Sequence, residues 1–235
     1  MNTLELLLLF VLSFLPPIFY AFWIRNTEKF NREKWLPIAL CFIWGATIAI
    51  IASIILEIIL QLSLVPSIDN PDTLALITVI IIAPFVEELT KPLCLRLKTV
   101  KKELVELEDG LIYGAVAGLG FSATENLLYG MHFLSLGIVF FLLMITIRSF
   151  GGCLLHASAT AWTGYGYGKA IMKKIPFIRV IPYFLLAILV HAFYNSILSF
   201  DFLGATIGLI TALVFTAVSI VIVRQKIKKL DEQSR

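Results

Sequence analysis

The amino-acid sequence predicts an all-α fold, a polytopic bundle of about seven transmembrane helices with the N-terminus outside and the C-terminus cytoplasmic. Its 235 residues are 59% hydrophobic and 15% charged, whereas soluble domains are about 45–50% apolar and about 25% charged. Apolar runs of roughly 20 residues, long enough to cross a bilayer, recur along the whole chain. Segments rich in Lys and Arg alternate with segments that lack them, and this bias sets the orientation of membrane helices.

Taken in order, the apolar runs define the expected membrane spans. They cover residues 4–24, 35–62, 74 to about 95, 110–130, 138–168, 181–198 and 202–223. The fifth run is too long for one plain span, so we expect a bend or break at Gly151-Gly152. The first run has no basic flank and no small-residue cleavage site after it, which favours a retained helix over a signal peptide.

The connecting segments predict the topology. Basic segments follow the first, third, fifth and seventh spans and are expected in the cytoplasm, while the segments 63–73, 131–137 and 199–201 contain no Lys or Arg. The net charge of +3 lies mostly in these loops and therefore does not indicate a nucleic-acid partner. Three cysteines, each in an apolar run, are interpreted as small buried hydrophobes. The whole chain, 1–235, is expected to form one integral membrane domain.

The third span carries charges in an unusual place. Glu87, Glu88 and Lys91 follow an almost entirely apolar stretch, and a charge at the centre of a membrane helix costs about 2.5–3.5 kcal/mol even on a lenient scale. Lys91 lies one turn from both carboxylates, so it can neutralise one of them while the other faces elsewhere. Prolines at 84 and 92 are expected to bend the helix around this stretch.

Three further spans contain polar residues that are expensive in hydrocarbon. Such residues usually face the interior of a bundle, where they pair or line a wet cavity. They are Glu125 and Asn126 on the fourth span, Arg148 and His156 on the fifth, and His191 and Asn195 on the sixth. We expect these groups and the charges of the third span to meet in one polar cavity.

These side chains are suited to hydrolysis without a serine or cysteine nucleophile. A carboxylate in a low-dielectric site can activate water, and His or Asn can stabilise a developing oxyanion. A His₂-carboxylate metal site fits the same residue types, although no H-E-x-x-H motif is present. A purely structural bridge between Glu125 and Arg148 remains an alternative.

The motifs resemble those of the PrsW family of intramembrane proteases, within the wider superfamily of CAAX-processing and bacteriocin-processing membrane peptidases. The similar motifs span about 74–198, which we take as the core of the domain. They are E-E-x-x-K at Glu87, Glu88 and Lys91; F-x-x-x-E-N at Phe121, Glu125 and Asn126; the histidine His156 before a Gly-rich stretch; and H-x-x-x-N at His191 and Asn195. The usual final Asp of the family is Asn here, which favours a hydrogen-bonding role for Asn195 over an anionic one.

The resemblance implies an intramembrane endopeptidase that cleaves a membrane-associated protein, for example a membrane-anchored regulator such as an anti-sigma factor, in the cell membrane of a prokaryote. The catalytic residues it implies are Glu87, Glu88, Glu125, His156, His191 and Asn195, with support from Lys91, Phe121, Asn126 and Arg148. We expect Glu88 to be the base, although Glu87 and Glu88 could exchange roles.

A metal is left open, because relatives have been viewed both as metalloproteases and as glutamate-based proteases. If a divalent metal such as zinc is present, its ligands are expected to be Glu125, His156 and His191. Two other classes of function remain: a proton- or ion-coupled transporter that uses the same cluster, and a catalytically silent membrane regulator on the same scaffold.

Overall fold

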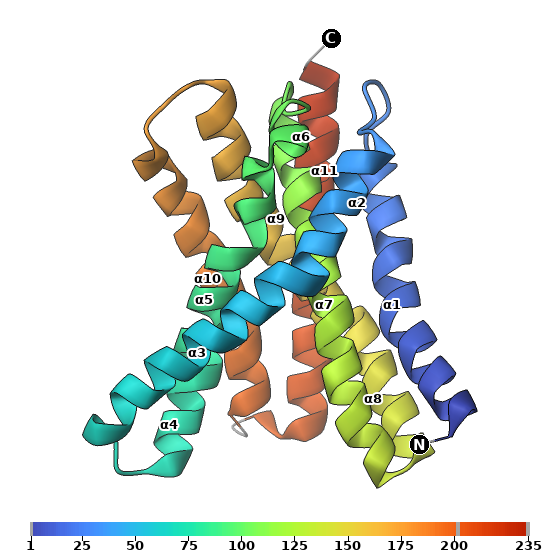
Figure 1. The fold of residues 1–235 in the computed structure, drawn as a ribbon, viewed down its shortest axis with the longest axis vertical. Helices are drawn as coiled ribbons and strands as arrows, with labels where there is room; N and C mark the ends of the chain where they lie inside the picture. The colour runs from blue at the N-terminus through green and yellow to red at the C-terminus, as the bar shows by residue number, and fades with distance from the viewer. Residues whose placement is uncertain (1, 201–202, 234–235) are drawn as a thin grey trace.

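The computed structural model describes residues 2–200 and 203–233, and these are helical apart from short turns and loops. The end of the predicted turn at 199–201 and the predicted start of the last span at Phe202 lie outside the described residues. The α-helices, shown in Figure 1, are α1 (Thr3–Arg25), α2 (Trp35–Trp44), α3 (Ile50–Leu64), α4 (Pro71–Ile77), α5 (Ala83–Thr90), α6 (Lys98–Lys101), α7 (Leu107–Leu136), α8 (Ile138–Phe150), α9 (Gly152–Met172), α10 (Ile181–Ser199) and α11 (Ala205–Gln233).

Several of these helices join into longer apolar segments. Short π-helical turns at Gly45–Ala49 and Thr78–Ile82 connect α2 to α3 and α4 to α5, so that each pair forms one continuous rod. In the described part of the chain six segments are long and apolar enough to cross a membrane. The all-α membrane fold is thereby confirmed, while the count of about seven spans stays a prediction.

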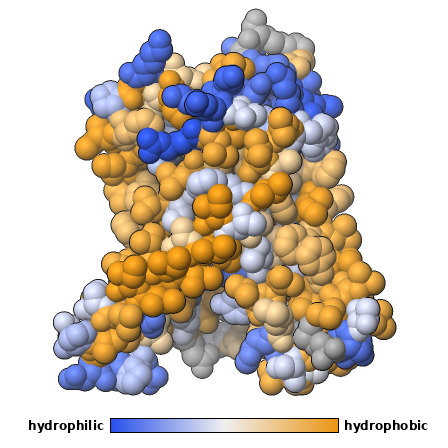
Figure 2. Space-filling model, in the orientation of Figure 1, coloured by the Kyte–Doolittle hydropathy of each residue, from blue (hydrophilic) through white to orange (hydrophobic). Residues whose placement is uncertain are grey.

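The outer surface of the bundle is apolar around its middle. Large hydrophobic side chains such as Leu6, Ile51 and Leu143 are more than half exposed. Figure 2 shows an apolar band with hydrophilic residues gathered toward the two ends. Because exposed apolar surface of this extent would not be stable in water, the protein is an integral membrane protein.

The segments rich in Lys and Arg lie at one end of the bundle. The segments 26–34 and 173–176, helix α6 and the C-terminal end of α11 lie at one end, and the N-terminus of α1 lies at the other (Figure 1). The basic segments therefore share one side of the bundle. Which side faces the cytoplasm stays a prediction.

Helix α7 runs through the middle of the bundle, and nearly every residue from Glu108 to Ala123 is buried. It packs against α1, α2, α9 and α11. Glycines make these approaches possible: a Cβ at Gly118 would collide with the backbone carbonyl of His156 on α9. The small residues of α7 and α9 thus bring the backbones of the two helices together.

The long fifth run breaks where its glycines predict. α8 ends at Phe150, Gly151 forms a turn, and α9 begins at Gly152. Arg148 and His156 consequently lie on different helices, one on each side of the break.

Candidate active site

Helix α5 is held between two irregular turns that its prolines explain. In the π-helical turn before it, the amide of Ala83 donates to the carbonyl of Thr78. Pro84 has no N–H to offer, so the carbonyl of Val79 lacks a donor in its own helix. The side-chain amide of Asn195 on α10 supplies it, at 2.8 Å. Asn195 thus connects α10 to the irregular turn that precedes the two glutamates.

Lys91 lies between the two glutamates of α5. Its Nζ is 2.7 Å from Oε2 of Glu87 and 2.9 Å from Oε1 of Glu88, and its side chain is fully buried. The expectation that Lys91 serves one carboxylate while the other faces elsewhere therefore differs from the structure. The long lysine side chain reaches i−3 and i−4 equally well, so one ammonium pairs with both carboxylates.

His156 connects this group to the fourth and fifth predicted spans. Its Nδ1 lies 2.9 Å from Nζ of Lys91, and its Nε2 lies 2.7 Å from Oε2 of Glu125. A lysine ammonium only donates, so Nδ1 accepts and Nε2 carries the proton that goes to Glu125. Arg148 is the last member of this chain of contacts, and its guanidinium lies 2.7 Å from the same oxygen of Glu125.

Glu88 is enclosed by hydrogen-bond donors. Its Oε2 accepts from the hydroxyl of Thr160 at 2.8 Å, and its Oε1 lies 3.1 Å from Nδ1 of His191. Since Nδ1 donates to the carboxylate, the Nε2 atom of His191 keeps its lone pair. That Nε2 lies 3.9 Å from Oε2 of Glu87, a separation that one water molecule can bridge.

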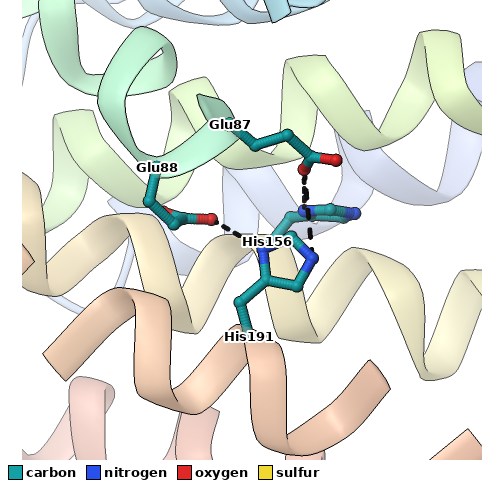
Figure 3. A group of neighbouring side chains, drawn as sticks. All are labelled: Glu87, Glu88, His156 and His191. Atoms are coloured by element: carbon teal, nitrogen blue, oxygen red, sulfur yellow. Dashed lines mark hydrogen bonds and ion pairs between the residues drawn. The ribbon is translucent and has the colours of Figure 1, made fainter. Parts of the chain in front are cut away.

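Figure 3 shows how four of these side chains converge from α5, α9 and α10. Glu87, Glu88, His156 and His191 each offer a donor atom, all within 4.8 Å of one another. Carboxylate and imidazole are zinc ligands, so the donor types suit a metal. Lys91 Nζ, however, already lies within 2.9 Å of three of the four residues.

One face of the cluster opens to a cavity of about 530 Å³. Glu87, Glu125, Arg148, His156, His191 and Asn195 all line it, whereas Glu88 does not. The exposed fraction is 6% for Glu87 and 0% for Glu88. Of the two glutamates of α5, Glu87 is therefore the one that water in the cavity can reach.

The sequence-predicted residues occupy distinct positions around this cavity. Phe121 packs under the cluster, with Lys91 Nζ 4.3 Å from its ring centroid and the His156 ring centroid at 5.6 Å. Asn126 accepts from Arg148 Nε at 2.8 Å and so orients the guanidinium. Asn195 lines the cavity but contacts Val79 rather than the cluster.

Several polar residues of the site were not singled out from the sequence. Thr160 supports Glu88, and Glu57, Tyr129 and Tyr194 line the cavity. Glu57 could have been found, since it is a lone carboxylate inside the second apolar run. The hydroxyl groups gave no such signal, because Thr and Tyr are common in membrane helices.

The fold and the site define an integral membrane protein with a buried Glu–Lys–His cluster that borders a partly open cavity. The chain belongs to the PrsW family: the family model described as "PrsW family intramembrane metalloprotease" matches residues 33–223. The curated protein Protease PrsW of Clostridioides difficile (strain 630) is 28% identical over 122 residues, which cover 52% of this chain and 50% of that protein. The match thus spans about half the length of this relative. No solved structure matches the chain.

Proposed function

We propose that this protein is an intramembrane endopeptidase that hydrolyses a peptide bond of a membrane-associated protein through a glutamate-activated water. The observation that carries the proposal is the position of Glu87, whose carboxylate lines the cavity 3.9 Å from His191 Nε2 and is held by Lys91. Membership of the PrsW family supports peptide hydrolysis as the reaction.

In this mechanism a water molecule donates one hydrogen bond to Glu87 and another to Nε2 of His191. Glu87 takes a proton from the water, and the oxygen attacks the carbonyl carbon of the scissile peptide bond. The tetrahedral intermediate collapses when its C–N bond breaks, and the proton held by Glu87 passes to the leaving amine. Asn195 has a second amide hydrogen and is our candidate for binding the carbonyl oxygen.

The sequence favoured Glu88 as the base, with an exchange of roles left open. The burial of Glu88 supports Glu87 as the base instead, because both carboxylate oxygens of Glu88 already bind Lys91, His191 and Thr160. We therefore propose that Glu88 is a positioning residue. It orients His191 and helps to hold the ammonium of Lys91 beside Glu87.

Lys91 supplies the positive charge at the centre of the proposed site. A metal bound by Glu87, Glu88, His156 and His191 would have to displace its ammonium from three of the donors. A site built on Glu125, His156 and His191 meets a similar difficulty, because Glu125 is already paired with Arg148 and with Nε2 of His156. The arrangement thus does not fit a metal without rearrangement, although the donor types do.

The metal question has a direct test. Purified protein is analysed for bound metal, and its cleavage activity is measured before and after treatment with a chelator. The proposal expects full activity after chelation. Activity that is lost with the chelator and restored by zinc would contradict the proposal. It would show that a metal displaces the ammonium of Lys91 from the cluster in the active protein.

The proposed activity is tested with a library of single-span membrane proteins reconstituted with the full-length protein. New N-termini are identified by mass spectrometry, with wild type compared to Glu87→Gln. Cleavage by wild type alone supports the proposal. Absence of cleavage, together with ion or substrate flux into proteoliposomes, would support a transporter instead, and absence of both would indicate a silent regulator. A membrane-anchored regulator such as an anti-sigma factor, in the cell membrane of a prokaryote, is our first candidate substrate.

A further inference from the structure

A second group of carboxylates lies far from the cavity, at the end of the bundle that carries the C-terminus (Figure 1). Glu28 comes from the loop between α1 and α2, and Glu106 and Glu108 come from the start of α7. Each offers one carboxylate oxygen, and the three oxygens lie within 4.8 Å of one another. We refer to Glu28, Glu106 and Glu108 as the acidic triad.

Two members of the acidic triad are buried with an oxygen that has no partner. The exposed fraction is 0% for Glu28 and 1% for Glu108, and Oε1 of each accepts no hydrogen bond from the residues that the structure describes. The other oxygen of Glu28 accepts the amide of Glu33, at 3.2 Å. Buried polar atoms are nearly always satisfied in folded proteins, and an unsatisfied one costs about 1–3 kcal/mol or more when charged. A missing partner at both positions therefore points to a ligand.

The basic residues nearby do not supply that partner. Arg25 donates to the backbone carbonyl of Glu33 and Arg32 to that of Glu28. Among residues 2–200 and 203–233, no Lys or Arg forms an ion pair with the acidic triad. Burial raises the pKa of Glu28 to about 8 and that of Glu108 to about 7, because the charged forms are poorly compensated.

We propose that the acidic triad is a binding site for a hard divalent cation, Mg²⁺ or Ca²⁺, held by one oxygen each of Glu28, Glu106 and Glu108. Hard cations prefer carboxylate oxygens, and waters commonly complete their coordination. The absence of His and Cys from the acidic triad separates this site from the imidazole-containing cluster in the membrane.

A cation at this site would connect two parts of the chain that are distant in sequence. It would join the loop carrying Glu28 to the first turn of α7. The same loop is held to α11 by Asp231, which accepts the amides of Lys29 at 2.9 Å and Phe30 at 3.3 Å. The ion would therefore stabilise the packing of α1, α7 and α11 without contacting the proposed active site.

The test measures cation binding by the full-length protein in detergent, using calorimetric titration with MgCl₂ and CaCl₂ and the unfolding temperature in each salt. Wild type is expected to bind one equivalent of cation and to unfold at a higher temperature when it is bound. Glu108→Gln and Glu28→Gln should each weaken binding by at least about tenfold, since changing even an outer-shell partner of a metal costs about 10–100-fold. Both variants should remain folded, because each removes a buried, poorly compensated charge.

Two controls separate the acidic triad from other acidic groups. Glu103→Gln removes a nearby carboxylate that pairs with Lys34 at the surface, and Glu87→Gln alters the membrane cluster. Both should keep the affinity of wild type. The proposal is overturned if wild type takes up no cation at about 10 mM, ten times the weakest usual dissociation constant of protein calcium sites. Equal affinity in Glu108→Gln and wild type would overturn it as well.

Discussion

Each charge in the membrane cluster has a partner that compensates its burial. Lys91 pairs with both Glu87 and Glu88, Arg148 pairs with Glu125, and His156 joins the two groups. Removing one member of a buried ionic group leaves an uncompensated charge, which typically costs about 3–5 kcal/mol. Single substitutions of Lys91 or Arg148 should therefore impair folding as well as activity, and neutral replacements of uncharged neighbours are more informative.

Thr160 is an uncharged neighbour of Glu88 that can be replaced in this way. Thr160→Val keeps the shape of the side chain but removes the hydroxyl that donates to Glu88 at 2.8 Å. We expect the free energy of unfolding to fall by about 1–3 kcal/mol, because a buried carboxylate oxygen loses its partner. Denaturant unfolding in detergent measures this loss, with Thr160→Ser as the control that keeps the hydroxyl. Equal stability of the two variants would contradict the role assigned to Thr160.

At the scale of the elements, close contact between α7 and α9 positions the site. Gly118 lies against the backbone of His156, the residue that links Lys91 to Glu125. The absence of a side chain at Gly118 thus lets α9 approach α7 closely, and this approach sets the position of His156. The irregular turn before Pro84 also positions the site. It leaves the carbonyl of Val79 without a donor in its own helix, and the side-chain amide of Asn195 donates to that carbonyl.

Gly118→Ala should consequently be far more harmful than its size suggests. The added methyl group collides with the carbonyl of His156, so α7 and α9 must separate or shift. We expect the cleavage rate to fall by about 100-fold, the usual consequence of misplacing catalytic groups by an ångström. Gly152→Ala is the matched control, because its Cβ would meet no atom nearer than 3.5 Å. Similar rates for the two variants would show that the contact is unimportant.

Much of the fold and part of the site follow from the sequence alone. Hydropathy predicts the apolar helices, and the cost of burying charge identifies Glu87, Glu125, Arg148 and His191 as inward-facing groups. The connection of Glu88 to Glu125 through Lys91 and His156 is visible only in the structure. Such contacts depend on helix rotation and on irregular turns, which hydropathy does not encode.

At the scale of the whole molecule, the orientation in the membrane can be predicted and tested. The basic segments share one end of the bundle and are expected in the cytoplasm (Figure 1). A cysteine introduced at Asp69 should react with an impermeant maleimide in intact cells, and one at Lys101 only after the membrane is permeabilised. The native cysteines are buried and provide a low background. The reverse labelling pattern would invert the topology.

The central claim is that Glu87 activates the attacking water, and the cleavage rates of Glu87→Gln, Glu88→Gln and Glu57→Gln on one shared substrate test it most directly. All three carboxylates lie in or next to the same cavity, but only Glu87 faces both the cavity and His191 Nε2. We predict that Glu87→Gln lowers the rate by at least about 100-fold, that Glu88→Gln retains measurable activity, and that Glu57→Gln stays close to wild type. Full activity of Glu87→Gln, with all three proteins inserted in the membrane equally well, would contradict the claim.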